Sequence, residues 1–283
     1  MTEQIPRITV HITTRDRHSE LALTLLSLMQ QTYSKWDLLL LDDNSGTPLQ
    51  NCYFVTLTIA ELRQRGHAVK LIRNTLPGNV CDARNLLIDE DDFEDNIFTI
   101  RIDDDVVLNP DYFERLLEVI DAGYDIATGV IYPYGRPEFV RELRHIKDII
   151  CLHELDAEGN LIRNDDDLGY LYDTHKILPC DQFRSHALYY RGIQKKVRYP
   201  TNLHRGFREE LFFSFKAIFE GYTIGANTGA ICYHLIAPSG GRRDPELGRK
   251  DYEDDQTARK WVKRQFSKRG DFLKQHHDKV LKQ

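Results

Sequence analysis

The sequence predicts an α/β fold built on a mostly parallel, doubly wound sheet of the Rossmann-like type. Residues 8–13 and 36–41 are apolar or β-rich, as expected of buried strands. Between them, Leu21, Leu25 and Leu28 recur at helical spacing. Strand and helix patterns continue to alternate over the first half of the chain. Because parallel neighbours need crossover connections, this alternation favours a parallel sheet.

Further elements are indicated by their apolar spacing and their end signals. They are a helix that ends near Gly66, a strand over 69–73, a short helix over 83–89, a strand over 97–102, a helix from Asn109-Pro110 to Gly123, a strand over 124–132, a hairpin over 149–163, a helix over 208–220 and a strand over 223–234. The polar stretch after the hairpin has no clear period. A loop over 237–243 and a basic helix come last.

The composition is that of an ordinary globular protein, with 41% hydrophobic and 29% charged residues. No apolar run approaches the roughly 20 residues that cross a bilayer, and no signal-like segment stands at the N-terminus. The five cysteines are an odd number without a C-x-x-C pair, which indicates reduced thiols. We therefore expect a cytoplasmic protein. The net charge of −6 argues against wholesale nucleic-acid binding.

Two acidic clusters follow expected strands. Asp42-Asp43 comes after the second strand and Asp103-Asp104-Asp105 after the fourth. In an open parallel sheet, ligands bind beyond the carboxyl ends of the strands, so both clusters are expected to face one crevice. Clustered carboxylates repel one another unless a cation is present, and oxygen ligands favour Mg²⁺ or Mn²⁺. We therefore expect a metal-diphosphate site, with a solvated turn of helix-capping aspartates as the alternative.

Several short motifs occur in order along the first part of the chain. They are Thr13-Thr14-Arg15-Asp16-Arg17, Ser27-Leu28 with Gln31-Thr32-Tyr33, Leu41-Asp42-Asp43-Asn44-Ser45, Ala83-Arg84-Asn85 and Ile102-Asp103-Asp104-Asp105. Together they resemble the opening of family 2 glycosyltransferases of the GT-A fold. The resemblance implies a metal-dependent, inverting transfer of a sugar to an acceptor hydroxyl, from a nucleoside-diphosphate sugar donor, with a UDP-sugar favoured.

The resemblance also implies how the metal is held. Asp105 is the first choice of ligand and Asp103 the second, for a Mn²⁺ or Mg²⁺ ion that neutralises the departing diphosphate. Asp104 is expected to face the ribose and sugar. His234, at the end of an expected strand, is a further candidate ligand, with a structural histidine as the alternative. The loop after it would close over the diphosphate, with Arg242 or Arg243 supplying charge.

Further residues are expected around the nucleotide. By the same resemblance, Thr13 and Arg15 would line its pocket, and Asp43, or Asp42 in its place, would accept hydrogen bonds from the base. Arg84 would pair with a phosphate as a bidentate donor, and Asn85 would help to orient the site. The alternative for the last two is a merely polar helix surface.

Transfer also requires a base that removes the acceptor proton. In the family this base belongs to an E-D pair at a helix start. Gly206-Phe207-Arg208-Glu209-Glu210-Leu211 has that shape, with Glu210 where the aspartate would be. Because glutamate is one methylene longer, either Glu210 or Glu209 is a candidate. Acids in a first helical turn also occur for helix-dipole reasons alone.

The expected division places a GT-A domain over 1–250, with a nucleotide-sugar-binding half over 1–125 and an acceptor-binding half over 126–250, and a basic helical tail over 251–283. From Gln256 to Gln283, nine Lys/Arg stand against two Asp. The apolar residues among them fit either a helix at the inner face of a membrane, which suits a lipid-linked acceptor, or a helix docked on the domain. A glycan is another acceptor class, and a nucleic-acid acceptor stays open.

Two other functions remain as alternatives. A non-catalytic nucleotide-sugar-binding protein of the same fold would need no base. A sugar nucleotidyltransferase would need a glycine-rich phosphate loop after the first strand, and residues 13–17 contain no glycine.

Overall fold

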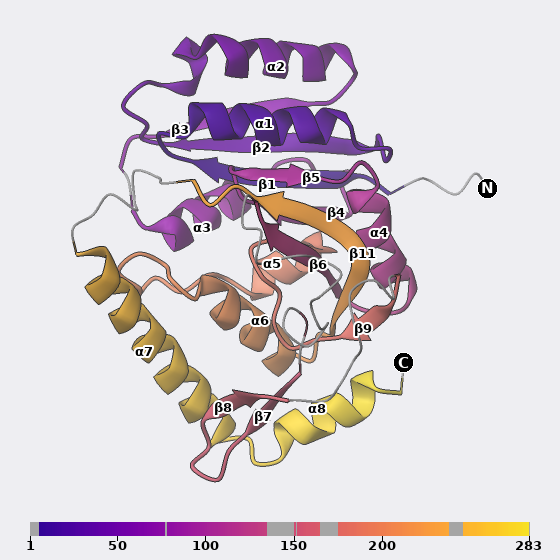
Figure 1. Cartoon of the computed structure of the whole chain (residues 1–283), viewed down its shortest axis with the longest axis vertical. Helices are drawn as coiled ribbons and strands as arrows, with labels where there is room; N and C mark the ends of the chain where they lie inside the picture. Colours follow the sequence, from indigo (N-terminus) through magenta and orange to yellow (C-terminus); the bar gives the residue numbers. More distant parts are fainter. Residues whose placement is uncertain are drawn as a thin grey trace.

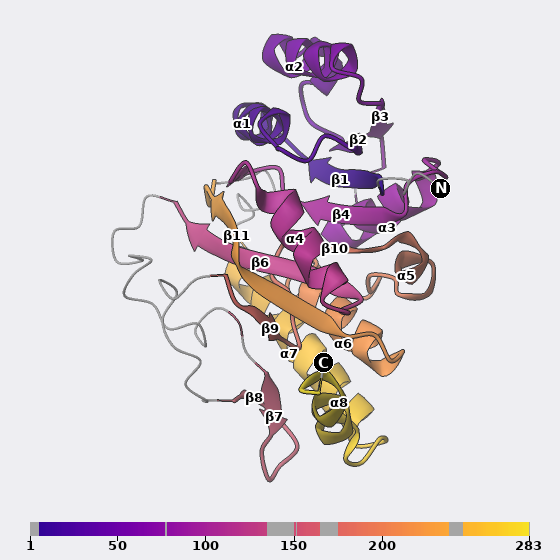
Figure 2. The ribbon, with the colours of Figure 1, turned by 90° about the vertical axis from the view of Figure 1, so that its right-hand side faces the viewer.

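The computed structural model describes residues 6–76, 78–134, 150, 152–164, 175–237 and 246–282. A nine-stranded sheet runs through this part of the chain, with helices on both of its faces (Figure 1). The strand order is β3-β2-β1-β4-β10-β6-β11-β5, and β9 pairs with β11. The sheet twists strongly from β3 to β9 (Figure 2). The predicted α/β class is confirmed.

The first four strands are parallel neighbours, as expected from their crossover helices. They are β1 (Ile8–Thr14), β2 (Trp36–Asp43), β3 (Val69–Asn74) and β4 (Phe98–Ile102). The connecting helices are α1 (His18–Met29), α2 (Tyr53–Gln64), which follows a single 3-10 turn η1 (Leu49–Asn51), and α3 (Val80–Glu90). In β2, Leu38 and Leu40 face one core while Leu39 and Leu41 face another, so both faces of the sheet are buried.

The second half of the sheet is mixed. Its strands are β5 (Val106–Leu108), β6 (Ile126–Pro133), β9 (Ile177–Pro179), β10 (Ala187–Tyr190) and β11 (Ile224–His234). β10 lies between β4 and β6 and is antiparallel to both. The sequence did not predict this central strand, because it is short and follows a polar stretch without a period. β11 is parallel to β6 and antiparallel to β5.

The remaining elements cover the sheet or lie beyond it. They are α4 (Tyr112–Asp121), the hairpin of β7 (His153–Leu155) and β8 (Leu161–Arg163), α5 (Arg191–Lys196), α6 (Glu209–Phe219), α7 (Leu247–Phe266) and α8 (Phe272–Val280). In Figure 1, α7, α8 and the β7–β8 hairpin are at the bottom of the view. The hairpin has the predicted turn, in which Asp156 accepts hydrogen bonds from the amides of Glu158 and Asn160. In the described part of the chain, no helix combines the length and the apolar character needed to cross a membrane.

The basic tail consists of two helices rather than one. They are separated near Gly270, which adopts φ 55°. The boundary expected at residue 250 falls inside α7. Val262 and Phe266 of α7 are buried in the same core as α6, and Trp261 packs on Phe212 with ring centroids 4.8 Å apart. The apolar side of this segment is therefore docked on the rest of the protein.

Candidate active site

A large cavity opens where β1, β2 and β4 end. It has a volume of about 1450 Å³, and both halves of the chain, the β7–β8 hairpin and α7 contribute to its walls. Most of the predicted site residues line it, namely Thr13, Arg15, Asp43, Arg84, Asp103, Asp104, Asp105, Glu209, Glu210 and His234. Asp42 and Asn85 do not. The loop expected to close over the diphosphate, from residue 238 on, lies outside the described residues.

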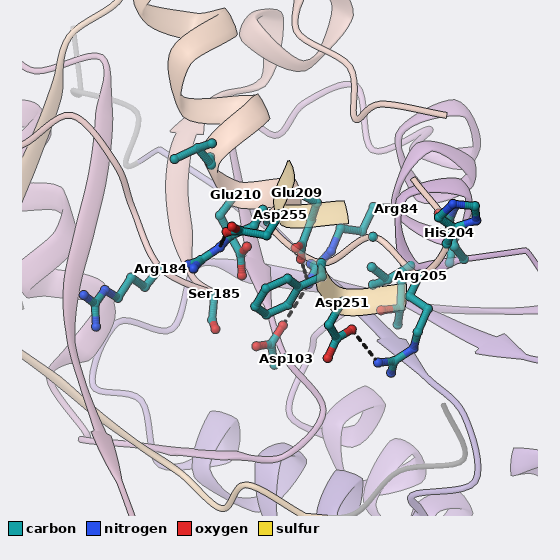
Figure 3. A pocket seen from close by; sticks show the side chains of 18 of the residues that line it. Arg84, Asp103, Arg184, Ser185, His204, Arg205, Glu209, Glu210, Asp251 and Asp255 are labelled. Atoms are coloured by element: carbon teal, nitrogen blue, oxygen red, sulfur yellow. Dashed lines mark hydrogen bonds and ion pairs between the residues drawn. The ribbon is translucent and has the colours of Figure 1, made fainter. Parts of the chain in front are cut away.

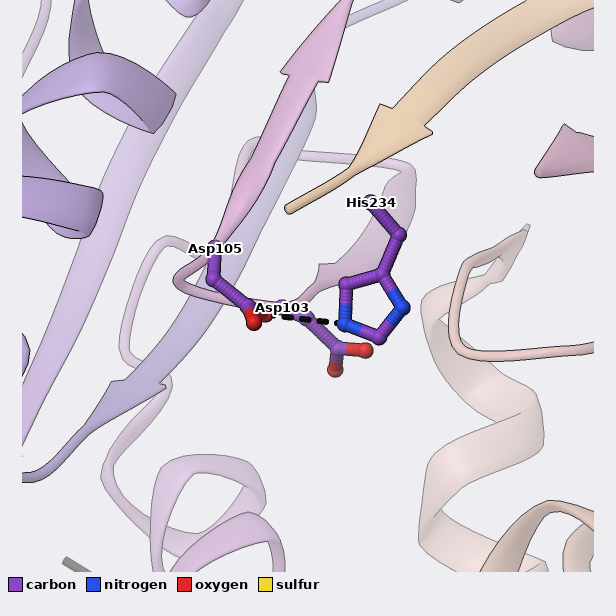
Figure 4. Close-up of side chains that lie close together, drawn as sticks. All are labelled: Asp103, Asp105 and His234. Carbon is purple, nitrogen blue, oxygen red and sulfur yellow. Dashed lines mark hydrogen bonds and ion pairs between the residues drawn. The ribbon is translucent and has the colours of Figure 1, made fainter. Parts of the chain in front are cut away.

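The three aspartates lie in the turn between β4 and β5. Ligand atoms of Asp103, Asp105 and His234 lie within 4.8 Å of one another (Figure 4). His234 reaches this turn because β11 pairs antiparallel with β5, in a register that sets His234 opposite Val106. Nε2 of His234 lies 3.0 Å from Oδ1 of Asp105. Two carboxylates and an imidazole form a donor set that suits Mn²⁺ or Mg²⁺.

Neighbouring cations keep part of this cluster ionised. Burial acts to raise the pKa of Asp103, but the charges of Arg84, His186 and Arg101 hold it well below its usual range. Burial instead raises the pKa of Asp104 to about 6, although Arg17 and the Thr14 hydroxyl oppose this rise. Thr14 Oγ1 donates to Asp104 at 2.6 Å.

Arg17 is a cation of the site that sequence analysis missed. Its Nη1 lies 2.8 Å from Oδ1 of Asp104 and 3.1 Å from Oδ2 of Asp105. Its Nη2 donates to the carbonyl of Ala237 at 3.0 Å. Arg17 therefore connects the aspartate turn to the segment that follows β11. Its position in a motif directly after β1 was the available signal.

The two aspartates at the end of β2 have different surroundings. Asp42 is fully buried and accepts hydrogen bonds from Arg73 and from the amides of Ser45 and Leu49, so it holds the loop after β2. Asp43 lines the cavity. Burial raises the pKa of Asp43, against a hydrogen bond of 2.8 Å from Asn74.

Arg84 and Asn85 follow each other on α3 but face different neighbours. Arg84 is buried, with Nη2 2.9 Å from Asp103 and 3.3 Å from Glu209. Asn85 instead bonds the backbone of Tyr199, donating to its carbonyl and accepting from its amide, both at 3.1 Å. Asn85 thus fixes the segment around Tyr199 rather than lining the cavity.

The two glutamates at the start of α6 also differ. Glu209 is enclosed between Arg84 and Arg101, whose Nη2 lies 3.1 Å from its carboxylate. The Glu210 side chain is 22% exposed and lies 3.8 Å from Arg101. Figure 3 shows both carboxylates at one side of the cavity, with Asp103 facing them. Arg101 was missed because an arginine in the middle of a buried strand gives no functional signal in the sequence.

The glutamates titrate as a pair. Burial and the repulsion of Glu210 raise the pKa of Glu209 to about 8, although Arg101 and Arg84 oppose this. For Glu210, burial acts to raise the pKa, but Arg101 and a hydrogen bond with Glu209 bring it below its usual value. Opposite shifts of this kind are expected of two close carboxyls, because the first to ionise raises the pKa of the other.

Basic side chains gather on the wall formed by the hairpin, the loop before α6 and α7. They are Arg163, Arg205, Arg208, Lys250 and Arg259. Several are paired with aspartates of α7. Arg205 lies 2.7 Å from Asp251, and both Arg208 and Arg259 lie 2.7 Å from Asp255. This wall is thus a network of ion pairs anchored on α7.

The family model described as "Glycosyl transferase family 2" matches residues 9–212. The chain belongs to glycosyl transferase family 2. The match takes in β1, the aspartate turn and the Glu209-Glu210 pair, and it ends before β11 and α7. No curated protein matches the chain.

Solved structures show that this family 2 chain has the GT-A fold. One similar structure is "Crystal structure of S. aureus TarS", with a TM-score of 0.56 and 15% identity, covering 89% of this chain and 39% of that one. Another is "Crystal structure of S. aureus TarS 1-349", with a TM-score of 0.55 and 16% identity, covering 94% of this chain and 74% of that one. The chain therefore spans well under half the length of the longer of these two structures.

Proposed function

We propose that this family 2 chain transfers a sugar from a nucleoside-diphosphate sugar to an acceptor hydroxyl. The observation that carries the proposal is the convergence of Asp103, Asp105 and His234 in the cavity that also holds Glu210. A divalent cation site and a candidate base in one cavity are what such a transfer requires. A protein that only binds nucleotide sugars needs no base.

Asp105, Asp103 and His234 would hold the Mn²⁺ or Mg²⁺ ion. When bound, the ion supplies positive charge that stabilises the departing diphosphate. Asp105 is the best-placed ligand, because its Oδ1 contacts His234 and its Oδ2 accepts from the amide of Ala237 at 3.1 Å. Its carboxylate is thereby fixed in direction.

Thr13, Arg15 and Asp43 would receive the nucleotide at the ends of β1 and β2. We favour Asp43 over Asp42 as the acceptor of hydrogen bonds from the base. Both carboxylate oxygens of Asp42 already accept hydrogen bonds, from Arg73 and from two backbone amides. Uridine is the base implied by the family resemblance. Asp104 would face the ribose and sugar.

Glu210 is the better candidate for the base. Its side chain is partly exposed to the cavity and its pKa is lowered, so it is ionised and able to take a proton at neutral pH. Glu209 is enclosed by two arginines and holds the proton of the pair. The acceptor hydroxyl would lose its proton to Glu210 as its oxygen attacks the sugar carbon, and the bond to the diphosphate would break with inversion.

The proposed acceptor class is a glycan or a lipid-linked hydroxyl. Val262 and Phe266 of α7 and Leu273 of α8 are packed inside the protein, so they would not be available to a membrane that carries a lipid-linked acceptor. A cytoplasmic location and the division at residue 250 stay predictions from the sequence.

The test is release of nucleoside diphosphate from a panel of UDP-, GDP- and dTDP-sugars with Mn²⁺ or Mg²⁺, comparing the wild type with Asp105→Ala. Consumption of one donor that needs the metal and is abolished by Asp105→Ala would support the transferase. Tight binding of a donor without turnover, in the presence of mixed glycan, lipid and nucleic-acid acceptors, would favour the non-catalytic binder.

A further inference from the structure

The loop before α6 is held by a single carboxylate from α7. The backbone amides of His204, Arg205, Gly206 and Phe207 all donate to Asp254, at 2.6, 3.0, 3.1 and 3.1 Å. One oxygen of Asp254 accepts from His204 and the other from the next three residues. Asp254 is fully buried. Charge-assisted hydrogen bonds of this kind are the stronger class, and four of them converge here.

The loop needs such an anchor because its backbone is in unusual conformations. Gly206 has φ 87°, and a Cβ at this position would clash with Cγ1 of Val80. Arg208, which directly precedes Glu209, has φ 70°, in the left-handed region that is costly for a residue with a side chain. These conformations persist only where the surroundings impose them. The amides of 204–207 precede the helix, so no helical carbonyl can satisfy them.

The same loop contacts the start of α3 on its other side. Asn79 caps α3 and also donates to the carbonyl of Leu203 at 2.6 Å. α3 carries Arg84, which contacts Glu209. The loop is therefore clamped between α3 and α7, and it leads directly into the two glutamates that face the cavity.

We propose that Asp254 is a positioning residue for the proposed base, which makes this inference rest on the proposed transferase function. By fixing residues 204–207, Asp254 sets the direction in which α6 starts and hence the place of the Glu210 carboxylate. The family match ends at residue 212, so the residue that holds the base in place lies outside the part that resembles the family.

The test compares Asp254→Asn with Glu253→Gln. The asparagine keeps the shape but turns one acceptor oxygen into a donor that faces backbone N–H groups. Glu253 lies in the same turn of α7, where its carboxylate pairs with Arg249 at 2.6 Å and lies 3.4 Å from the His204 imidazole. None of its described hydrogen bonds comes from a backbone amide of 204–207, so Glu253→Gln tests a side-chain contact to the loop without the backbone bonds. Hydrogen exchange measures the loop directly: we expect amides 204–207 to exchange faster in Asp254→Asn and unchanged in Glu253→Gln.

Kinetics distinguish positioning from a general structural role. With the donor that the panel identifies, we expect Asp254→Asn to lower kcat by up to about 10²-fold while the donor KM and Mn²⁺ affinity change little. On a Glu210→Gln background the same substitution should cost less than about threefold, because its effect acts through Glu210. Equal losses on both backgrounds, or wild-type kcat despite faster exchange, would overturn the proposal.

A second variant covers the case in which Asp254→Asn does not fold. Asp254→Glu keeps the charge and the acceptors but displaces them by one methylene, and we expect an intermediate loss of kcat. Retained Mn²⁺ binding reports a folded site, because the proposed ligands belong to the β4–β5 turn and to β11 rather than to α7 or the 204–207 loop. A wild type that turns over no donor would contradict the proposed function, whereas the exchange measurement would still report whether Asp254 holds the loop.

Discussion

Nε2 of His234 lies 3.0 Å from Oδ1 of Asp105, although 129 residues separate them along the chain. The contact follows from sheet topology, because β11 runs antiparallel to β5 and ends beside the turn that carries the aspartates. One ligand candidate thus comes from beyond the family match and two come from within it. The proposed metal site can form only when both halves of the sheet are in place.

His234→Ala should weaken Mn²⁺ binding by at least about tenfold, because it removes the imidazole donor of the set. Electron paramagnetic resonance of added Mn²⁺ measures the free and bound ion directly. His18→Ala is a suitable control, since this imidazole bonds the carbonyl of Thr47 at 2.7 Å and does not line the cavity. Equal affinity in the wild type and His234→Ala would exclude His234 as a ligand.

Glu210→Gln and Glu209→Gln should have very different effects on kcat. The first removes the proposed base and should lower kcat by roughly 10²–10⁴-fold. The second reproduces the protonated form that Glu209 already has near pH 7, so the loss should be much smaller. Steady-state kinetics at pH 7 checks both variants. A larger loss in Glu209→Gln would reverse the assignment of the base.

The raised pKa of Glu209 also predicts how stability depends on pH. The folded protein keeps a proton on Glu209 up to about pH 8, whereas the unfolded chain releases it near the ordinary value of 4.5. The folded state thus binds more protons between these values, so the free energy of unfolding should fall as the pH rises through this window. The pKa of Glu210 is lowered from 4.5, so this residue changes the free energy of unfolding only at pH values below about 4.5. Urea unfolding at pH 5.5 and 8 should show a smaller fall for Glu209→Gln than for the wild type.

Substitutions of the neighbours Asp42 and Asp43 should have different effects, the first on the stability of the fold and the second on binding of the donor. Asp42→Asn leaves Arg73 and a buried amide with a poorer partner, so we expect the free energy of unfolding to fall by about 1–3 kcal/mol. Asp43→Asn should leave stability nearly unchanged and raise the donor KM. Urea unfolding and donor kinetics on both variants provide the comparison. A donor KM that changes only in Asp42→Asn would shift the proposed base contact to that residue.

Phe266→Ala should destabilise the protein by about 3–5 kcal/mol, because the ring is 2% exposed and packs edge-on against Phe215 in the main core. Lys260→Ala, on the exposed side of α7, should cost little. Thermal or urea unfolding measures both. If Phe266→Ala were as stable as the wild type, the docking of α7 would be wrong and a membrane-facing helix would regain support.

Sequence patterns predict those helices and strands in which the apolar residues follow a clear helical or strand spacing. β2 contains a short apolar run, β1 and β4 are rich in β-branched residues, and the order of motifs around Asp103 indicates the family. β10 was missed because Ala187–Tyr190 is too short to show a period. α3 was predicted three residues late, although Asn79 and Asp82 form a capping box that marks its start.

Site residues that stand in a short sequence motif could be predicted. Residues whose role depends on a partner far away along the chain could not. Asp103 and Glu210 stand in motifs. Arg101 is buried in β4, and the Glu209 side chain that accepts its hydrogen bond is 108 residues away, so only the folded chain brings the two together. Asp254 lies in an acidic run of α7 that is typical of a solvated helix face, and only tertiary structure brings the amides of residues 204–207 to it.

The placement of β10 bears on how the chain folds as it is synthesised. The edge of β4 that β10 covers stays unpaired until residue 190 has left the ribosome, about 90 residues after β4 itself. An open edge of a parallel sheet is a template for pairing with other chains. The nascent chain is thus exposed to aggregation over this interval, and slowing synthesis between β4 and β10 should lower the yield of native protein.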